Sequence, residues 1–93
     1  PQEYVVVLDE HGAQYSSGEF AEFISNCQLH GAIKILTFVT GGATGFTRSL
    51  LQQANTVLSL SRMTFPHQFC RVILLEQVYR AYTIIAGEPY HKV

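Results

Sequence analysis

The chain is poor in charged residues and in cysteine. Charged residues make up 14% of its 93 residues, whereas hydrophobic residues make up 47%. Strong non-specific binding to nucleic acid needs many lysine and arginine contacts to phosphate, so this composition argues against it. The two cysteines, Cys27 and Cys70, are too few for a disulfide framework and form no CxxC motif. This cysteine content favours a reducing, intracellular setting, and we expect a cytoplasmic protein.

Several other signatures are missing from the sequence. No apolar run reaches transmembrane length without a polar break, and no signal-peptide pattern is present, so we expect no membrane association. The GxSxG nucleophile elbow of serine hydrolases is absent. We also expect no metal site, because no cysteine lies at zinc-ligand spacing and no two histidines have the i, i+4 spacing of a helical metal pair. The four histidines are His11, His30, His67 and His91.

The apolar content is high for so short a chain. Residues 1–93 form one domain, and a domain of this size buries only about 60–65% of the surface of its unfolded chain. A small domain with sparse charge often covers apolar surface with a partner, which suggests an oligomer or a missing piece of chain. The sequence also begins at Pro1 and enters a strand almost at once, which suggests a cut inside a larger fold.

Charge is distributed unevenly along the sequence. The segment up to Thr47 is net acidic by four, and the segment from Arg48 onward is net basic by three. One interpretation is ordinary variation over a protein surface. The other is a modest basic face in the second half that binds an anion or RNA. The charges alone leave both interpretations open.

Apolar runs alternate with helical patterns along the chain. Continuous apolar runs predict strands buried on both faces at residues 4–8, 33–39 and 56–60. The segment Asp9-Glu10-His11-Gly12 is expected to end the first of them. Apolar residues at helical spacing predict helices at residues 17–30, 48–54 and 66–86. This order predicts an α/β fold with a parallel sheet, helices on both of its faces, and ligand sites at the carboxyl ends of its strands.

Helix-end signals support these boundaries. Ser17 is expected to cap the first helix, which Gly31 stops, and Thr47 is expected to cap the second. Pro66 fits the first turn of the third helix, and Gly87 fits its C-terminal cap. The third helix is apolar on nearly every side, so we expect it to be buried on nearly every side.

Polar residues are rare on this last helix. Glu76 and Arg80 lie four positions apart and can pair on one face. Such a pair is usually structural. Arg71, Gln77 and Arg80 are nevertheless the positions at which a functional group would stand out on an apolar element.

Residues 40–45, Thr-Gly-Gly-Ala-Thr-Gly, form a glycine loop between a predicted strand and a predicted helix. Glycines at such a place let backbone amides approach a ligand closely, and a helix N-terminus favours negative charge. The spacing matches neither GxGxxG nor the phosphate-binding P-loop. A ligand loop and a tight strand-to-helix turn therefore both remain possible, and a dinucleotide or ATP phosphate site is disfavoured.

Four short motifs occur in a specific order: the pair Gly41-Gly42 with Gly45, residues 64–67 (Thr-Phe-Pro-His), residues 78–81 (Val-Tyr-Arg-Ala) and residues 89–91 (Pro-Tyr-His). In this order and spacing the chain resembles the bacterial RlmH family over nearly its whole length. RlmH proteins are SPOUT-class methyltransferases that modify a pseudouridine in 23S ribosomal RNA. The family usually has isoleucine where this chain has Thr40, and the family's N-terminal strands are absent here.

The resemblance implies a fold and a cofactor. The fold is an α/β trefoil knot at the C-terminal end, in which the last helix is threaded through a loop and contributes to a homodimer interface. The cofactor is S-adenosylmethionine, bound in the knot. Position by position, Leu8 would line the adenosine pocket, and Gly41 and Gly42 would present backbone to the cofactor. The remaining cofactor-binding residues would form one wrapping loop: Ser61, Arg62, Met63, Thr64, Phe65 and Pro66.

The resemblance also implies a reaction and a partner, the large-subunit rRNA of the ribosome. N3 of the pseudouridine would attack the sulfonium methyl group, with Arg80 stabilising the developing imide anion. Tyr90 and His91 are expected to handle protons or to place the substrate at the dimer interface. Two other functions stay open: a non-catalytic RNA- or ribosome-binding module with the same fold, and a nucleotide-binding regulatory domain.

Overall fold

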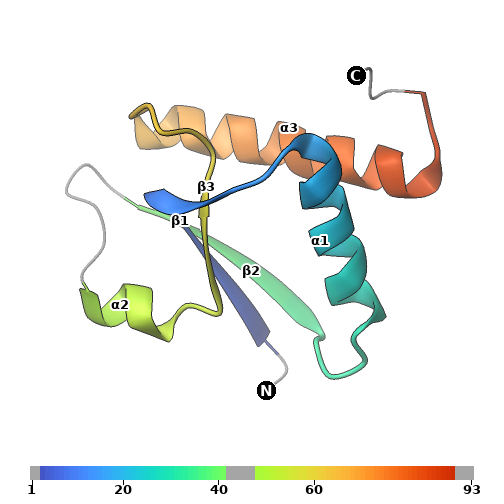
Figure 1. Ribbon diagram of the computed structural model, residues 1–93, viewed down its shortest axis with the longest axis horizontal. Helices are drawn as coiled ribbons and strands as arrows, with labels where there is room; N and C mark the ends of the chain where they lie inside the picture. Colours follow the sequence, from blue (N-terminus) through green and yellow to red (C-terminus); the bar gives the residue numbers. More distant parts are fainter. Residues whose placement is uncertain (1–2, 42–47, 90–93) are drawn as a thin grey trace.

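The computed structural model describes residues 3–41 and 48–89, except the side chains of Arg48 and Leu50. Six elements follow one another (Figure 1): β1 (Glu3–Gln14), α1 (Ser17–Leu29), β2 (Ile35–Thr40), α2 (Arg48–Gln53), β3 (Thr56–Ser59) and α3 (His67–Ala86). The three strands form one parallel sheet in the order β2-β1-β3. The predicted alternation of strands and helices and the predicted parallel sheet are therefore confirmed.

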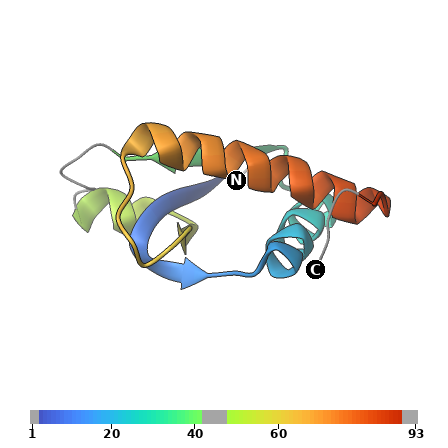
Figure 2. The ribbon, with the colours of Figure 1, turned by 90° about the horizontal axis from the view of Figure 1, so that it is seen from above.

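The helices surround the sheet. Figures 1 and 2 show α1 and α2 on opposite sides of the strands, as predicted, while α3 runs across the end of the sheet at which the strands finish. The path of a knot would include residues 42–47, which lie outside the described residues, so the knot stays a prediction. None of the helices in the described segments is long and apolar enough to cross a membrane.

β1 is longer than its apolar run predicts. Leu8 pairs with Leu58 of β3, and after four residues Ala13 pairs with Leu58 as well, followed by Gln14 with Ser59. Residues 9–12 therefore form an irregularity inside the strand, and the prediction that they end it is wrong. Neighbouring residues do not determine this extension, because it depends on pairing with a strand more than 40 positions away.

Gly12 permits the close approach of β1 to β3. A Cβ atom at this position would lie 2.6 Å from the carbonyl oxygen of Val57, which is closer than real Cβ atoms come. The missing side chain thus lets the second part of β1 lie directly against the β3 backbone.

The N-cap of helix α1 lies one residue earlier than the sequence predicts. The N-cap is Ser16, whose hydroxyl oxygen accepts from the Glu19 amide at 3.1 Å, while the Ser16 amide donates to the Glu19 carboxylate at 2.8 Å. These two bonds form a capping box, which a serine at position 17 could not form with Glu19. Ser17 lies instead in the first turn, where its hydroxyl can reach another helix.

Helix α3 keeps its predicted end and shifts its start by one residue. Pro66 is the N-cap rather than a first-turn residue, and the helix begins at His67. Gly87 ends the helix in the left-handed conformation at φ 74°, and its amide donates to the carbonyl oxygens of Thr83 and Ile84. Glycine fits this position because it has no Cβ to oppose positive φ.

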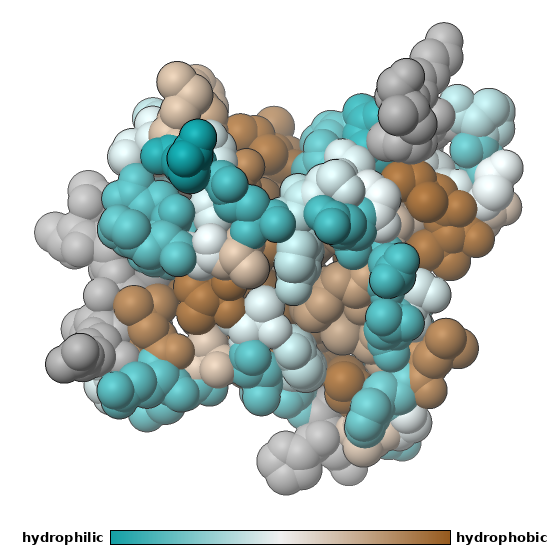
Figure 3. Space-filling view, viewed as in Figure 1, coloured by the Kyte–Doolittle hydropathy of each residue, from teal (hydrophilic) through white to brown (hydrophobic). Residues whose placement is uncertain are grey.

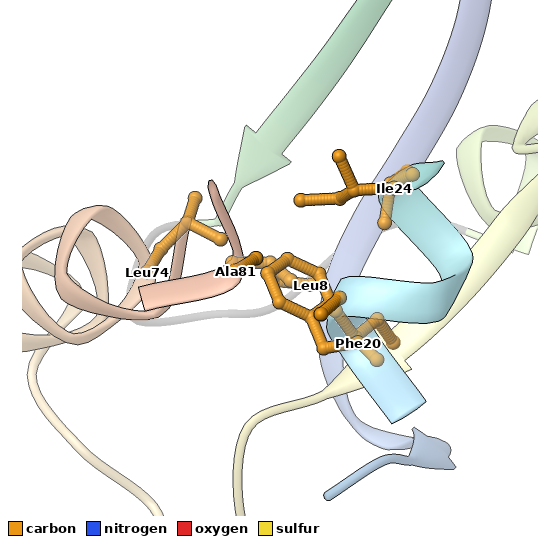
Figure 4. Close-up of a cluster of buried hydrophobic side chains, with 8 residues drawn as sticks. Leu8, Phe20, Ile24, Leu74 and Ala81 are labelled. Carbon is orange, nitrogen blue, oxygen red and sulfur yellow. The ribbon is translucent and has the colours of Figure 1, made fainter. Parts of the chain in front are cut away.

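The core lies between one face of the sheet and the helices α1 and α3. Figure 4 shows side chains of the strand residue Leu8, of α1 and of α3 pointing toward one another. The buried cluster consists of Val6, Leu8, Phe20, Ala21, Ile24, Leu58, Leu74 and Ala81. Phe20 also packs against Phe38 of β2, with ring centroids 6.1 Å apart. Val6 and Leu8, which point to the same face of β1, thus lie in one cluster with residues of both α1 and α3.

One face of α3 is not covered within the single chain. Its large apolar side chains are exposed by 39–68% along one stripe, and Figure 3 shows hydrophobic side chains reaching the surface along this helix. We call this the α3 stripe; it consists of Phe69, Val72, Leu75, Tyr79, Tyr82 and Ile85. A single chain therefore does not bury α3 on every side, and burial of this stripe by a partner subunit stays a prediction. The apolar residues of α3 form two faces, one in the core and one exposed.

The approach of β1 to β3 at Gly12 gives a stability prediction. Gly12→Ala forces a methyl group against the Val57 backbone, and we expect a loss of about 1–3 kcal/mol in the free energy of unfolding. Urea unfolding followed by circular dichroism measures it. Gly31→Ala is the matched control, because nothing lies within 4 Å of its Cβ position. Equal stability of the two variants would contradict the close approach.

Candidate cofactor site and active site

Three of the predicted cofactor segments meet at the carboxyl edge of the sheet. Leu8 pairs with Thr40 on one side and with Leu58 on the other. Gly41 directly follows Thr40, and the loop of residues 60–66 leaves β3 on the other side of Leu8. The sheet register thus places Leu8 between the two other segments. Its side chain points into the core, so its backbone is the part that faces this edge. Gly42 lies outside the described residues.

The loop that carries Ser61 to Pro66 is held by side-chain hydrogen bonds. The Ser59 hydroxyl donates to the Ser61 carbonyl at 2.9 Å, and the Met63 amide donates to the Ser61 hydroxyl oxygen at 3.0 Å. The Thr64 hydroxyl donates to the Glu10 carboxylate at 2.8 Å. The loop is therefore attached both to its own strand and to the irregular part of β1.

Most side chains of this loop face outward. Met63 is 72% exposed and Phe65 is 36% exposed, although both are large and apolar. Exposed apolar side chains on a loop that hydrogen bonds hold in place can pack against a bound molecule. The geometry therefore suits a loop that contacts a ligand with apolar side chains and with backbone groups.

An open depression lies beside this loop. It is lined by Glu10, His11, Gly12, Gln14 and Arg62. His11 is tied locally to Asp9, whose carboxylate accepts from the His11 amide at 3.0 Å. Of these lining residues the sequence predicted only Arg62. Glu10 was not predicted, because its segment was expected only to end the first strand, and its single signal was an acidic side chain at that strand end.

Arg80 is held in a hydrogen-bonded cluster on α3. Its Nη2 lies 2.6 Å and its Nε 3.1 Å from Oε2 of Glu76, which confirms the predicted i, i+4 pair. Glu76 Oε1 accepts from Gln77 Nε2 at 2.8 Å, and Gln77 Oε1 accepts from the Ser17 hydroxyl at 2.7 Å. The other two predicted catalytic residues, Tyr90 and His91, lie outside the described residues.

One chain does not bring Arg80 to the 61–66 loop. That loop precedes the first turn of α3, whereas Arg80 lies 13 residues beyond the first helical residue, His67. At about 1.5 Å per residue, this separation is about 20 Å along the helix axis. The loop precedes the start of α3 and Arg80 lies in its second half, so the two parts of the predicted site are separated along the same helix.

In the part of the chain that the structure describes, the remaining chemical groups do not form a second reactive centre. Burial raises the pKa of the Cys27 thiol on α1, which keeps it protonated and unreactive. Cys70 is half-buried at the start of α3, with its sulfur 3.9 Å from the Phe65 carbonyl oxygen. Within residues 3–41 and 48–89, no three histidine, cysteine or acidic side chains are grouped so that they could hold a metal ion.

The bond between Thr64 and Glu10 gives a prediction for the loop. Thr64→Val removes the hydroxyl donor and keeps the shape, so we expect a loss of about 1 kcal/mol of local stability. Amide hydrogen exchange at Met63 would then be about fivefold faster. Thr37→Val is the matched control, because it removes a hydroxyl bond of 2.6 Å to Glu3 elsewhere on the sheet. Unchanged exchange in Thr64→Val would show that Glu10 does not hold the loop.

Comparisons with known proteins agree with this architecture. A family model described as "Predicted SPOUT methyltransferase" matches residues 1–91. A protein of Carboxydothermus hydrogenoformans named "Ribosomal RNA large subunit methyltransferase H" is 54% identical over 92 residues, which are 99% of this chain and 57% of the relative. A Clostridium botulinum protein of the same name is 53% identical over 89 residues, which are 96% of this chain and 55% of that relative.

A solved structure shares the fold. The crystal structure of Archaeoglobus fulgidus Nep1 bound to S-adenosylhomocysteine superimposes with a TM-score of 0.56 at 14% sequence identity, covering 87% of this chain and 34% of the other. The chain spans slightly more than half the length of the curated relatives that it matches. These relatives confirm the resemblance to RlmH, and the family match shows that the chain belongs to the SPOUT methyltransferases.

Proposed function

We propose that this chain is part of an S-adenosylmethionine-dependent rRNA methyltransferase that acts on N3 of a pseudouridine in 23S rRNA. The observation that carries the proposal is the match of about 50% identity, over nearly the whole chain, to proteins named for large-subunit rRNA methylation. The edge at which Leu8, Gly41 and the 61–66 loop meet supports it, because ligands of parallel α/β sheets bind at such edges.

The residues at this edge fit the proposed cofactor. The solved neighbour with the same fold is bound to S-adenosylhomocysteine, the product form of this cofactor. In this chain, backbone groups of Gly41 and of the 61–66 loop would hold the adenosine and methionine parts. The exposed side chains of Met63 and Phe65 supply apolar surface for the adenine, and the Glu10 carboxylate beside Thr64 complements a positively charged molecule. When bound, the cofactor supplies an electrophilic methyl group on a sulfonium sulfur.

Arg80 is the side chain that we assign to transition-state stabilisation. N3 of the base is a weakly acidic imide nitrogen, so negative charge develops there during methylation. A guanidinium group whose direction is already determined by Glu76 can stabilise that charge without first reorganising. Tyr90 and His91 are assigned to proton handling and substrate placement, on the resemblance alone.

A homodimer through α3 would reconcile the separated parts of the site. The α3 stripe exposes six large apolar side chains, which a monomer rarely leaves in water as one strip. A two-fold axis perpendicular to α3 would pair the second half of one helix with the first half of its partner's. Arg80 of one copy would then lie nearer to the 61–66 loop of the partner than to its own. We therefore propose that the homodimer forms the complete site.

The methyltransferase proposal is tested with ribosomes as substrate. We expect the protein to bind S-adenosylmethionine in isothermal titration and to add a methyl group to 23S rRNA, detected by mass spectrometry of the nucleosides. Arg80→Ala should lower methyl transfer about 100-fold and leave cofactor affinity within about threefold. Arg71→Ala, an exposed arginine on the same helix, is the control and should stay active. If the protein bound ribosomes but bound no S-adenosylmethionine and transferred no methyl group, the non-catalytic module would be favoured instead.

The dimer proposal is tested by a charge in the α3 stripe. Leu75 is 68% exposed in the single chain, and Leu75→Glu would place a carboxylate inside the proposed interface, where an unpaired charge is costly. Light scattering after size exclusion should show a dimer for the unchanged protein and a monomer for this variant. Leu29→Glu, at an exposed apolar position on α1, should remain dimeric. A monomeric unchanged protein would refute the proposed interface.

A further inference from the structure

We propose that Ser17 and Gln77 are positioning residues, which set the direction of the Arg80 guanidinium through Glu76. The proposal rests on the proposed function, because it concerns the arginine to which we assign charge stabilisation. It names two side chains that contact neither reacting atom in the proposed chemistry. They act by orienting another residue.

A continuous series of hydrogen bonds connects the two helices. The Ser17 hydroxyl, in the first turn of α1, donates to Gln77 Oε1 at 2.7 Å. Gln77 Nε2 donates to Glu76 Oε1 at 2.8 Å. Glu76 Oε2 accepts from Arg80 Nη2 at 2.6 Å and from Arg80 Nε at 3.1 Å. Ser17 and Gln77 are 60 positions apart, so only the packing of α1 on α3 creates this series.

Glu76 determines which way the Gln77 amide faces, and Ser17 holds the amide in that position. A glutamine side chain has one accepting end and one donating end. The donating end faces Glu76, and the Ser17 hydroxyl donates to the accepting end that is left. A reversed amide would place its oxygen against the Glu76 carboxylate, which can only accept. The carboxylate thus selects the amide orientation, and the bond from the Ser17 hydroxyl fastens that amide to α1.

Glu76 then transmits this constraint to Arg80. Oε1 accepts from Gln77 Nε2 and, at 3.5 Å, from Arg80 Nε, while Oε2 accepts from both Nε and Nη2 of Arg80. A carboxylate bound at both oxygens cannot rotate without breaking a bond. All four side chains are half-buried, where charge-assisted hydrogen bonds are stronger than in water. The long and flexible arginine side chain is thereby held in one direction before substrate arrives.

Orientation of a charged group affects the rate more than the binding of cofactor. A displacement of about 1 Å at a reacting centre can cost a factor of about 100 in rate. Loss of Gln77 leaves the Glu76–Arg80 pair in place but lets it rotate, so we expect a smaller effect than loss of Arg80. The α1 side of the molecule therefore takes part in catalysis although it lies away from the predicted cofactor loop.

The alternative is that these bonds only fasten α1 to α3. A second bond between the same helices distinguishes the two possibilities, because Gln28 Nε2 donates to the Tyr82 hydroxyl at 3.3 Å and connects to neither Glu76 nor Arg80. Gln28→Ala is thus a matched control. It removes a glutamine that bridges the same two helices and leaves the series to Arg80 intact.

The experiment combines kinetics with an NMR signal. In the ribosome assay, Gln77→Ala and Ser17→Ala should each lower kcat about 5- to 10-fold with an unchanged KM for S-adenosylmethionine, and the double variant should be no slower than the slower single variant, because the residues act as one unit. Ser17→Thr keeps a hydroxyl and should therefore keep the kcat of the unchanged protein. In NMR, the Arg80 Nε–H signal should exchange slowly with water in the unchanged protein and rapidly in Gln77→Ala.

The outcomes separate this proposal from the proposed function. A kcat and an Nε–H signal that do not change in Gln77→Ala would overturn the positioning role. An equal fall of kcat in Gln28→Ala would also overturn it, in favour of a purely structural bridge. If the unchanged protein binds no S-adenosylmethionine and transfers no methyl group, the proposed function is wrong. The Nε–H signal then decides whether Ser17 and Gln77 hold Arg80.

Discussion

The repeated pairing of β1 with β3 is the constraint on which the rest of the structure depends. β1 pairs with β3 up to Leu8, forms the irregular segment of residues 9–12, and pairs with β3 again at Ala13 and Gln14. Gly12 makes this possible because the two backbones lie too close for a side chain. The same irregular segment carries Glu10 to the hydroxyl of Thr64. The sheet thus positions one side of the candidate cofactor loop, and the first turn of α3 holds its end at Phe65 and Pro66.

Helix α3 connects the two halves of the candidate site and keeps them apart. Its start follows the 61–66 loop, and Arg80 lies in its second half. Its core face, with Leu74 and Ala81, fastens it to the sheet and to α1. Its opposite face is the exposed α3 stripe. The core of the same chain covers only the first face, and the proposed homodimer would cover the second.

The regular elements could be predicted from the sequence because their signals are local. Apolar runs and helical spacing depend on neighbouring residues, and so do Gly87 as a helix end and the pair of Glu76 with Arg80. The predictions were wrong where a local sequence signal was compatible with two structures. Ser16 and Ser17 can both cap a helix in isolation, and only the capping box with Glu19 selects Ser16. The continuation of β1 was missed because it depends on β3, more than 40 residues later.

The sequence by itself determined the α/β class, the family and the identity of the residues that carry the proposed chemistry, because these depend on residue order and motif spacing. Only the tertiary structure decided which side chains meet. It brought the Glu10 carboxylate to the Thr64 hydroxyl. It placed Ser17 not at the N-cap but in the first turn of α1, where its hydroxyl donates to Gln77. It also exposed one face of a helix that is apolar all round. The physical reason is that hydrogen bonds and burial act between residues close in space, and folding sets that closeness independently of their separation in the chain.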